Sequence, residues 1–187
     1  SMGVIHSITM LILMPVFGIN QGAQPIIGFN YGAKKYDRVK EALKKAIIAA
    51  TTVVTIGFIV TQAIPNKLFG IFLDKSADIT NVLDVGVKGL RINLIMLPIV
   101  GFQIVSSNYF QATGKPKKAA LLGLSRQVLI LIPALLILPK IFNLAGVWAA
   151  GPVSDLIASV LTGIFLLKDL KELNKDIIVQ NRIIEER

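Results

Sequence analysis

The sequence contains no cysteine and a single histidine, His6. The absence of cysteine excludes disulfide bonds and thiolate metal sites, and it leaves the redox compartment undetermined. A lone histidine disfavours the histidine-rich zinc centre of a membrane metalloprotease. Neither a phosphate-binding loop nor a nucleophile with a neighbouring base occurs. We therefore expect a chain that is not an enzyme and holds no cofactor, and we assign no residue to a metal.

Charged residues are also scarce. They make up 17% of the 187 residues, whereas 53% are hydrophobic, and the mean hydropathy is +0.68. This is more apolar than the surface of a soluble domain tolerates. The composition therefore predicts a membrane protein, in which apolar residues gather into runs of about 20 that cross a hydrocarbon core about 30 Å thick.

Five apolar runs are long enough to cross a bilayer as helices. They cover residues 3–29, 46–64, 92–112, 119–138 and 144–167. Strands are disfavoured because an open sheet in lipid would leave backbone groups without hydrogen-bond partners. We predict an all-α polytopic bundle of about five transmembrane helices over residues 1–168, followed by a charged cytoplasmic extension over 169–187.

Prolines inside these runs predict local distortion. Pro15 and Pro25 interrupt the first run, which predicts a kinked or broken helix there. Pro98 and Pro133 fall in two others, where neighbouring helices can satisfy the backbone groups that a proline frees. Prolines therefore do not exclude these spans.

The net charge of +9 and the pI of about 9.9 come from an uneven distribution of basic residues. In a soluble protein this charge would suggest a nucleic-acid partner. Here the first connection, the third connection and the tail carry six, three and five basic residues, against five on the opposite side. The positive-inside rule accounts for that asymmetry without nucleic acid and predicts a multi-pass cell-membrane protein with a cytoplasmic C-terminus. An external N-terminus before five spans leads us to expect further sequence upstream.

Asp155 is the most informative single residue because it lies eleven residues into the fifth run, near the bilayer midplane. An ionisable residue at that depth indicates a functional site, typically for a cation or a proton. Asp155 shares one helix face with Ser159 and Thr162. The alternative is a structural carboxyl that is protonated or hydrogen-bonded. Asp155 is our candidate for cation coupling, with Ser159 beside it in a substrate cavity.

A polar stripe follows the third run. Gln103, Ser107 and Gln111 recur at every fourth position, with Asn108 at the edge of the stripe. Such a stripe lines a transport pathway in some membrane proteins, and in others it joins helices by hydrogen bonds. A similar pair, for which the structural role is slightly favoured, is formed by Asn20 and Gln24 of the first run. All six residues are candidates for lining a substrate cavity.

Arg126 is the only basic residue inside a span. It lies eight residues beyond Lys118, roughly 12 Å into the fourth run. An interfacial anchor whose side chain snorkels is the favoured role at that depth. The alternative is a counter-ion for a carboxylate such as Asp155.

Four segments resemble the multidrug and toxic compound extrusion (MATE) transporters. GINQGAQPIIGFNYGAKK, at 18–35, is similar to the end of the second helix in each lobe of that family. NYFQATGKPKKA at 108–119, SRQVLILIP at 125–133 and GVWAAGPVSD at 146–155 are similar to its C-terminal lobe, particularly in the bacterial branch. The four segments occur in the family's order over about 150 residues.

The resemblance implies a twelve-helix, two-lobe architecture with a central cavity. The five spans would correspond to helices eight to twelve, so the partners would be the N-terminal lobe and the seventh helix, together with membrane lipid. It further implies an antiporter that exports organic cations or drugs in exchange for sodium ions or protons. Some members carry coupling carboxylates on the first and fourth helices of this lobe, whereas residues 92–112 contain none.

Three functions remain open from the sequence. The first is the secondary antiporter, with Asp155 and the polar stripe lining the cavity. The second is a flippase for lipids or lipid-linked sugars, whose large cargo would call for several basic residues in the cavity. The third is a non-transporting membrane scaffold, whose exposed polar faces would cause association in detergent.

Overall fold

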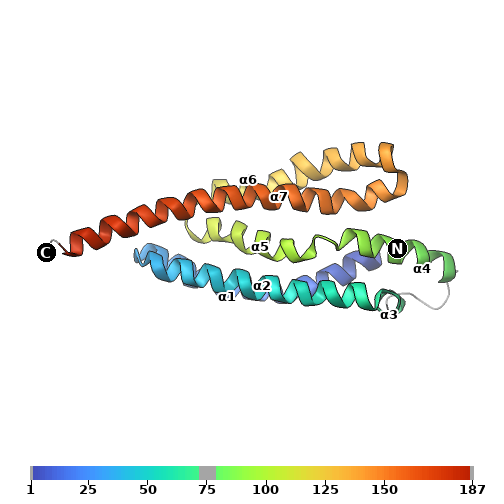
Figure 1. The fold of residues 1–187 in the computed structure, drawn as a ribbon, viewed down its shortest axis with the longest axis horizontal. Coiled ribbons are helices and arrows are strands. Elements are labelled where there is room, and N and C mark those ends of the chain that lie inside the picture. Colours follow the sequence, from blue (N-terminus) through green and yellow to red (C-terminus); the bar gives the residue numbers. More distant parts are fainter. Residues whose placement is uncertain (1, 72–78, 186–187) are drawn as a thin grey trace.

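The computed structural model describes residues 2–71 and 79–185, so the last two residues of the predicted extension lie outside the described part. Over these residues the chain consists of helices joined by short turns and contains no strand. The helices lie roughly along one long axis (Figure 1). This arrangement follows from the apolar runs, because a helix satisfies all of its backbone groups internally and needs no partner to enter lipid.

Helices α1 (Met2–Gly32) and α2 (Tyr36–Ala63) form the first antiparallel pair. Helix α1 is continuous through Pro15 and Pro25, so the chain is not broken at these prolines. The turn between the helices places Lys34 at a φ of 56°. The second helix begins among charged residues because Val39, Leu43 and Ala46 recur on one face and are buried against the core.

The third span is broken. Helix α3 (Pro65–Ile71) precedes α4 (Ile79–Asn93), which is followed after a short turn by α5 (Leu97–Ala112). The segments 86–93 and 97–112 together are long enough to cross a membrane and are bent by 47° at the break. Pro98 lies in the first turn of α5, where its missing N–H removes no intrahelical hydrogen bond.

The last two spans form a long hairpin. Helix α6 (Pro116–Leu124) leads into a π-helix, η1 (Ser125–Leu131), and then into α7 (Ile132–Glu185). The range labelled α7 covers two consecutive helices. Between them Asn143 adopts a φ of 51°, and the chain reverses its direction there. Figure 1 shows this reversal at the right and the remainder of α7 running the length of the molecule to the C-terminus.

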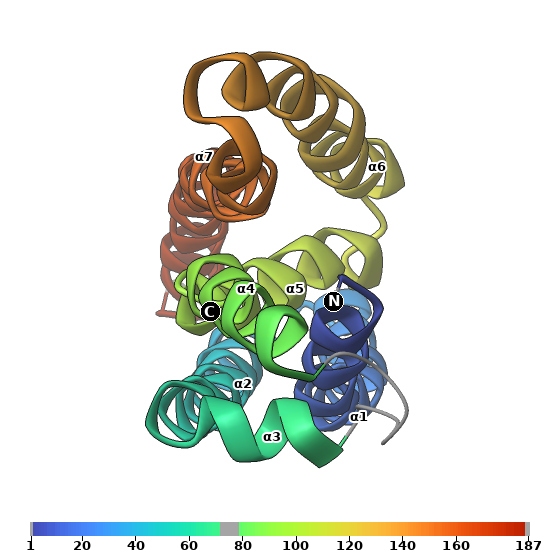
Figure 2. The ribbon, with the colours of Figure 1, turned by 90° about the vertical axis from the view of Figure 1, so that its right-hand side faces the viewer.

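Helix α5 occupies the middle of the bundle. It contacts α1 and α2 on one side and α6 and α7 on the other, as the end-on view shows (Figure 2). Tyr109 and Phe110, near its end, are fully buried. Many large apolar side chains remain exposed, among them Leu11, Ile56 and Leu129, as expected for helices that face lipid.

Four helices are long and apolar enough to span a membrane, and the bent pair would make a fifth. The prediction of an all-α polytopic bundle of about five transmembrane helices is therefore confirmed. The chain is a multi-pass membrane protein.

A close helix contact gives a test of this packing. A Cβ added at Gly101 of α5 would lie 3.0 Å from the backbone oxygen of Ala50 and 2.9 Å from Val54 of α2. We expect Gly101→Leu to destabilise the fold by about 1–3 kcal/mol, because α2 and α5 would have to separate. The measurement is the midpoint of thermal unfolding in detergent. Gly18→Leu is the control, since nothing lies within 4 Å of a Cβ there; equal effects of the two changes would contradict the packing described.

Candidate functional site

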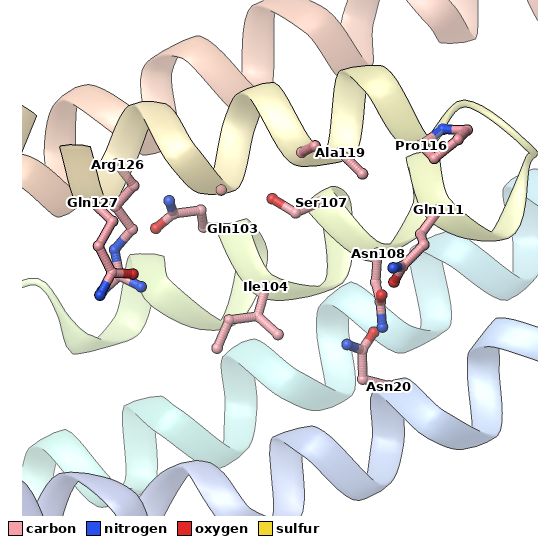
Figure 3. A pocket seen from close by; sticks show the side chains of 12 residues that line it. Asn20, Gln103, Ile104, Ser107, Asn108, Gln111, Pro116, Ala119, Arg126 and Gln127 are labelled. Carbon is pink, nitrogen blue, oxygen red and sulfur yellow. The ribbon is translucent and has the colours of Figure 1, made fainter. Parts of the chain in front are cut away.

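A cavity of about 500 Å³ opens between α1, α5 and the α6–η1 segment. Amide, hydroxyl and guanidinium groups dominate the polar part of its lining. These groups belong to Asn20, Gln103, Ser107, Asn108, Gln111, Arg126 and Gln127. Figure 3 shows them converging from the three segments. No carboxylate lines the cavity within the described residues.

Helix α5 supplies one wall of this cavity through its polar stripe. Gln103, Ser107 and Gln111 all line the cavity because a spacing of four residues returns each side chain to the same helix face. Gln103 is only 4% exposed, and its Oε1 has no hydrogen-bond partner among the described residues. A buried acceptor without a partner requires an explanation, and a ligand or a water molecule in the cavity would supply one.

The two asparagines lie at the boundary between α1 and α5. Figure 3 shows the amide of Asn20, from α1, facing the amide of Asn108, from α5. Both residues line the cavity, whereas Gln24, one turn beyond Asn20, is half-buried and does not. Of the predicted pair on the first span, Asn20 therefore lines the cavity and Gln24 does not.

Arg126 and Asp155 form an ion pair inside the membrane-spanning bundle. The Asp155 Oδ1 atom accepts a hydrogen bond from Arg126 Nε at 2.7 Å and lies 2.6 Å from Arg126 Nη2 in the ion pair. The carboxylate side chain is 11% exposed and the arginine side chain 40% exposed. Arg126 lines the cavity, whereas Asp155 does not. The guanidinium group of Arg126 thus borders the cavity, and the Asp155 carboxylate balances its charge.

The local backbone explains how Arg126 reaches this position. It lies in η1, a π-helical segment, together with Gln127, and both residues line the cavity. Short π-helical segments inside α-helices occur frequently at functional sites. Across the hairpin, Ser159 and Thr162 continue the face of Asp155, and their buried hydroxyl groups have no partner within the described part of the chain.

A second polar cluster was not predicted from the sequence. Asp169 of α7 is fully buried, and its Oδ2 accepts a hydrogen bond from the Tyr109 hydroxyl at 3.0 Å. Its Oδ1 accepts from Lys115 at 2.6 Å and from Lys118 at 3.1 Å. Burial opposes the charge of Lys115, but the hydrogen bond to Asp169, the charge of Asp169 and smaller contributions from Tyr31 together outweigh burial and hold the Lys115 pKa above its ordinary value. This cluster ties α7 to the end of α5 and the start of α6.

The described residues contain no group of three or more histidine, cysteine, aspartate or glutamate side chains that could hold a metal ion. The amide, hydroxyl and guanidinium groups that line the cavity support non-covalent binding. Its amides both donate and accept hydrogen bonds, and its arginine adds a fixed positive charge. Transporters bind their cargo in polar cavities of this kind, between the helices of a membrane bundle.

Comparison with known proteins identifies the family. The MatE family model matches residues 1–137, well over half of the chain. The chain therefore belongs to the MATE family of multidrug transporters, as its four sequence segments suggested. Members of this family are transporters rather than enzymes.

Solved structures agree with this assignment. A ligand complex of the MATE multidrug transporter DinF-BH superposes with a TM-score of 0.80 at 39% identity, over 90% of this chain and 37% of that one. A MATE in complex with MaL6 gives 0.86 at 19% identity, over 92% and 39% of the two chains. A MOP superfamily transporter from Pyrococcus furiosus gives 0.84 at 19% identity, over 92% and 38%. No curated protein matches the chain. The chain thus spans less than two fifths of these transporters.

Proposed function

We propose that this chain forms most of one lobe of a secondary antiporter that exports organic cations or drugs in exchange for sodium ions or protons. The observation that carries the proposal is the polar cavity beside the Arg126–Asp155 ion pair, in a chain of the MATE family. Its partner would be the N-terminal lobe and the seventh helix of the same transporter. The C-terminal end of α7 would lie in the cytoplasm, as the distribution of basic residues predicts.

The cavity suits a drug-sized molecule that combines apolar surface with a few polar groups. The apolar part of the lining comes from Ile104 of α5 and from Pro116, Ala119 and Ala120 of α6. Amide side chains hydrogen-bond many different groups, so a cavity of this kind accepts varied cargo without selecting one charge pattern. The DinF-BH protein, at 39% identity, is a multidrug transporter, which supports drug-like cargo for this chain.

Coupling would work through competition for Asp155. In the conformation described, the Arg126 guanidinium already forms an ion pair with the Asp155 carboxylate. A proton or sodium ion that binds Asp155 must therefore displace the guanidinium, which then gains freedom to move within the cavity. A ligand shifts a conformational equilibrium only through different affinities for the two states. Breaking and remaking this ion pair would supply such a difference between the two openings of the transporter.

The pair gives a test of this proposal. In membrane vesicles containing the assembled transporter, we expect Arg126→Gln to shift the pH dependence of drug transport by roughly half a unit or more toward alkaline pH. The physical reason is that removing the neighbouring positive charge makes Asp155 easier to protonate. Gln127→Ala is the matched control, because Gln127 lines the same cavity and has no ion-pair partner. An unchanged pH profile in Arg126→Gln would rule out the pair as the coupling element.

A further inference from the structure

A second groove lies between α2 and α7, near the start of α2 and the C-terminal part of α7. Its volume is about 470 Å³. Two lysines and several aliphatic side chains line it, chiefly Lys40, Lys44, Ile47, Ile48, Leu166 and Leu170. We refer to it as the α2–α7 groove. No part of the proposed transport site contributes to it.

The lining changes from polar to aliphatic along both helices. On α2, Lys40, Lys44 and Ile48 succeed one another at intervals of four residues, and each step advances about 6 Å along the helix. Helix α7 runs in the opposite direction (Figure 1). The residues of α7 that line the groove, Asn174, Leu170 and Leu166, are also four positions apart. Because the helices are antiparallel, Asn174 lies toward the start of α2 and Leu166 lies farther along it. The end of the groove lined by Lys40, Lys44 and Asn174, which we call its mouth, is cationic and polar, and the end lined by Ile48 and Leu166 is aliphatic.

The two lysines at the mouth have no anionic partner among the described residues. The neighbouring Lys45 pairs with Glu41 at 2.6 Å, and Lys115 and Lys118 pair with Asp169. Neither Lys40 nor Lys44 forms an ion pair within the described part of the chain. Two ammonium groups one helical turn apart repel each other unless an anion lies between them. The mouth of the groove therefore favours a negatively charged group.

The groove also faces away from the transport cavity. Viewed end-on, the cavity elements α1 and α6 lie at the right of the bundle and the pair α2 and α7 at the left (Figure 2). Ile48 is 55% exposed there, as expected for a side chain in contact with lipid. The basic residues of this end also predict that it lies at the cytoplasmic surface, where anionic lipids concentrate.

We propose that the α2–α7 groove binds one anionic glycerophospholipid, with its phosphate at Lys40 and Lys44 and an acyl chain along Ile48 and Leu166. Basic pockets between transmembrane helices at this interface bind anionic headgroups through the same charge complementarity. The lipid matches both halves of the groove, whereas a free phosphate would use only the lysines. The bound lipid would join α2 to α7 on the outer face of the lobe.

The test measures binding of dioleoylphosphatidylglycerol to the purified full chain in detergent, by native mass spectrometry. We expect binding at micromolar lipid and at least tenfold weaker binding of dioleoylphosphatidylcholine. The double variant Lys40→Gln/Lys44→Gln should weaken phosphatidylglycerol binding about tenfold or more, because each lysine near an anionic lipid contributes roughly a factor of five. Lys171→Gln/Lys175→Gln removes the same charge from exposed positions outside the groove and should change binding less than twofold.

Two further variants keep the test independent of folding defects. Lys40→Arg/Lys44→Arg retains the charge and should bind phosphatidylglycerol as the parent chain does. Ile48→Ser alters an exposed aliphatic residue and should weaken lipid binding while leaving the lysines intact. Equal weakening by the groove and control lysine pairs would overturn the proposal in favour of diffuse charge attraction. Full competition by glycerol phosphate, or equal binding of phosphatidylcholine, would likewise contradict a lipid groove.

Discussion

Asp155→Asn is expected to reduce export of a fluorescent organic cation at least tenfold in the assembled transporter. Asparagine is nearly isosteric with aspartate, but it carries no charge that could hold a coupling cation. It also leaves the Arg126 guanidinium, now paired at 2.6–2.7 Å, without a counter-ion inside the bundle. Removing one partner of such a pair is costly because the remaining charge is left uncompensated. Cellular dye accumulation, normalised to the amount of transporter in the membrane, measures the effect.

Two further variants separate coupling from stability. Arg126→Gln/Asp155→Asn removes both charges, so we expect it to restore protein levels relative to Asp155→Asn without restoring export. Val160→Ala is the control on the same helix, because Val160 is exposed and lines neither the cavity nor the ion pair. It should export normally. Parent-level export by the double variant would show that the pair is only structural.

Asp169→Asn is expected to lower the stability of the lobe by about 2–3 kcal/mol. The fully buried carboxylate holds Tyr109, Lys115 and Lys118 together, at distances of 2.6–3.1 Å. Hydrogen bonds to charged groups contribute about 1.5–3 kcal/mol each, and partial exposure of the lysines reduces that value here. Asparagine retains one acceptor but leaves two ammonium groups without a counter-charge. The midpoint of thermal unfolding in detergent, followed by loss of helical circular dichroism, measures the change.

The controls for this cluster distinguish its buried charge from surface charge. Tyr109→Phe removes one of the three hydrogen bonds and should destabilise less than Asp169→Asn. Glu41→Gln breaks an exposed pair with Lys45 and should leave the unfolding midpoint unchanged. An Asp169→Asn midpoint equal to that of Glu41→Gln would show that the cluster does not hold α7 to α5 and α6.

The helical class could be predicted because the bilayer sets the length of each apolar run. The positions of some helix ends could not. Helix α2 begins at Tyr36, among lysines that hydropathy assigns to a connection, because Val39 and Leu43 pack that charged segment against the core. The break between α4 and α5 and the π-helix η1 depend on backbone hydrogen bonding, which hydropathy does not register.

The cavity-lining stripe could be proposed from spacing alone, because a four-residue interval fixes Gln103, Ser107 and Gln111 on one face of α5. Which helix that face meets was not predictable from the sequence. The sequence left two roles open for Arg126, an interfacial anchor and a counter-ion for Asp155. It could not decide between them, because the two residues are 29 positions apart on a hairpin of unknown register. The Asp169 cluster was missed because its partners lie 51–60 residues away along the chain.

The most direct test of the central claim is accumulation of a fluorescent organic cation in cells that express this chain alone, or together with the N-terminal lobe and seventh helix of its transporter. We predict lowered accumulation only when both parts are present, and its loss when Asp155→Asn is introduced into this chain. Export by this chain alone would contradict its role as one lobe of a two-lobe antiporter. Unchanged accumulation in the presence of both parts, correctly inserted, would contradict drug export and favour a flippase or a scaffold.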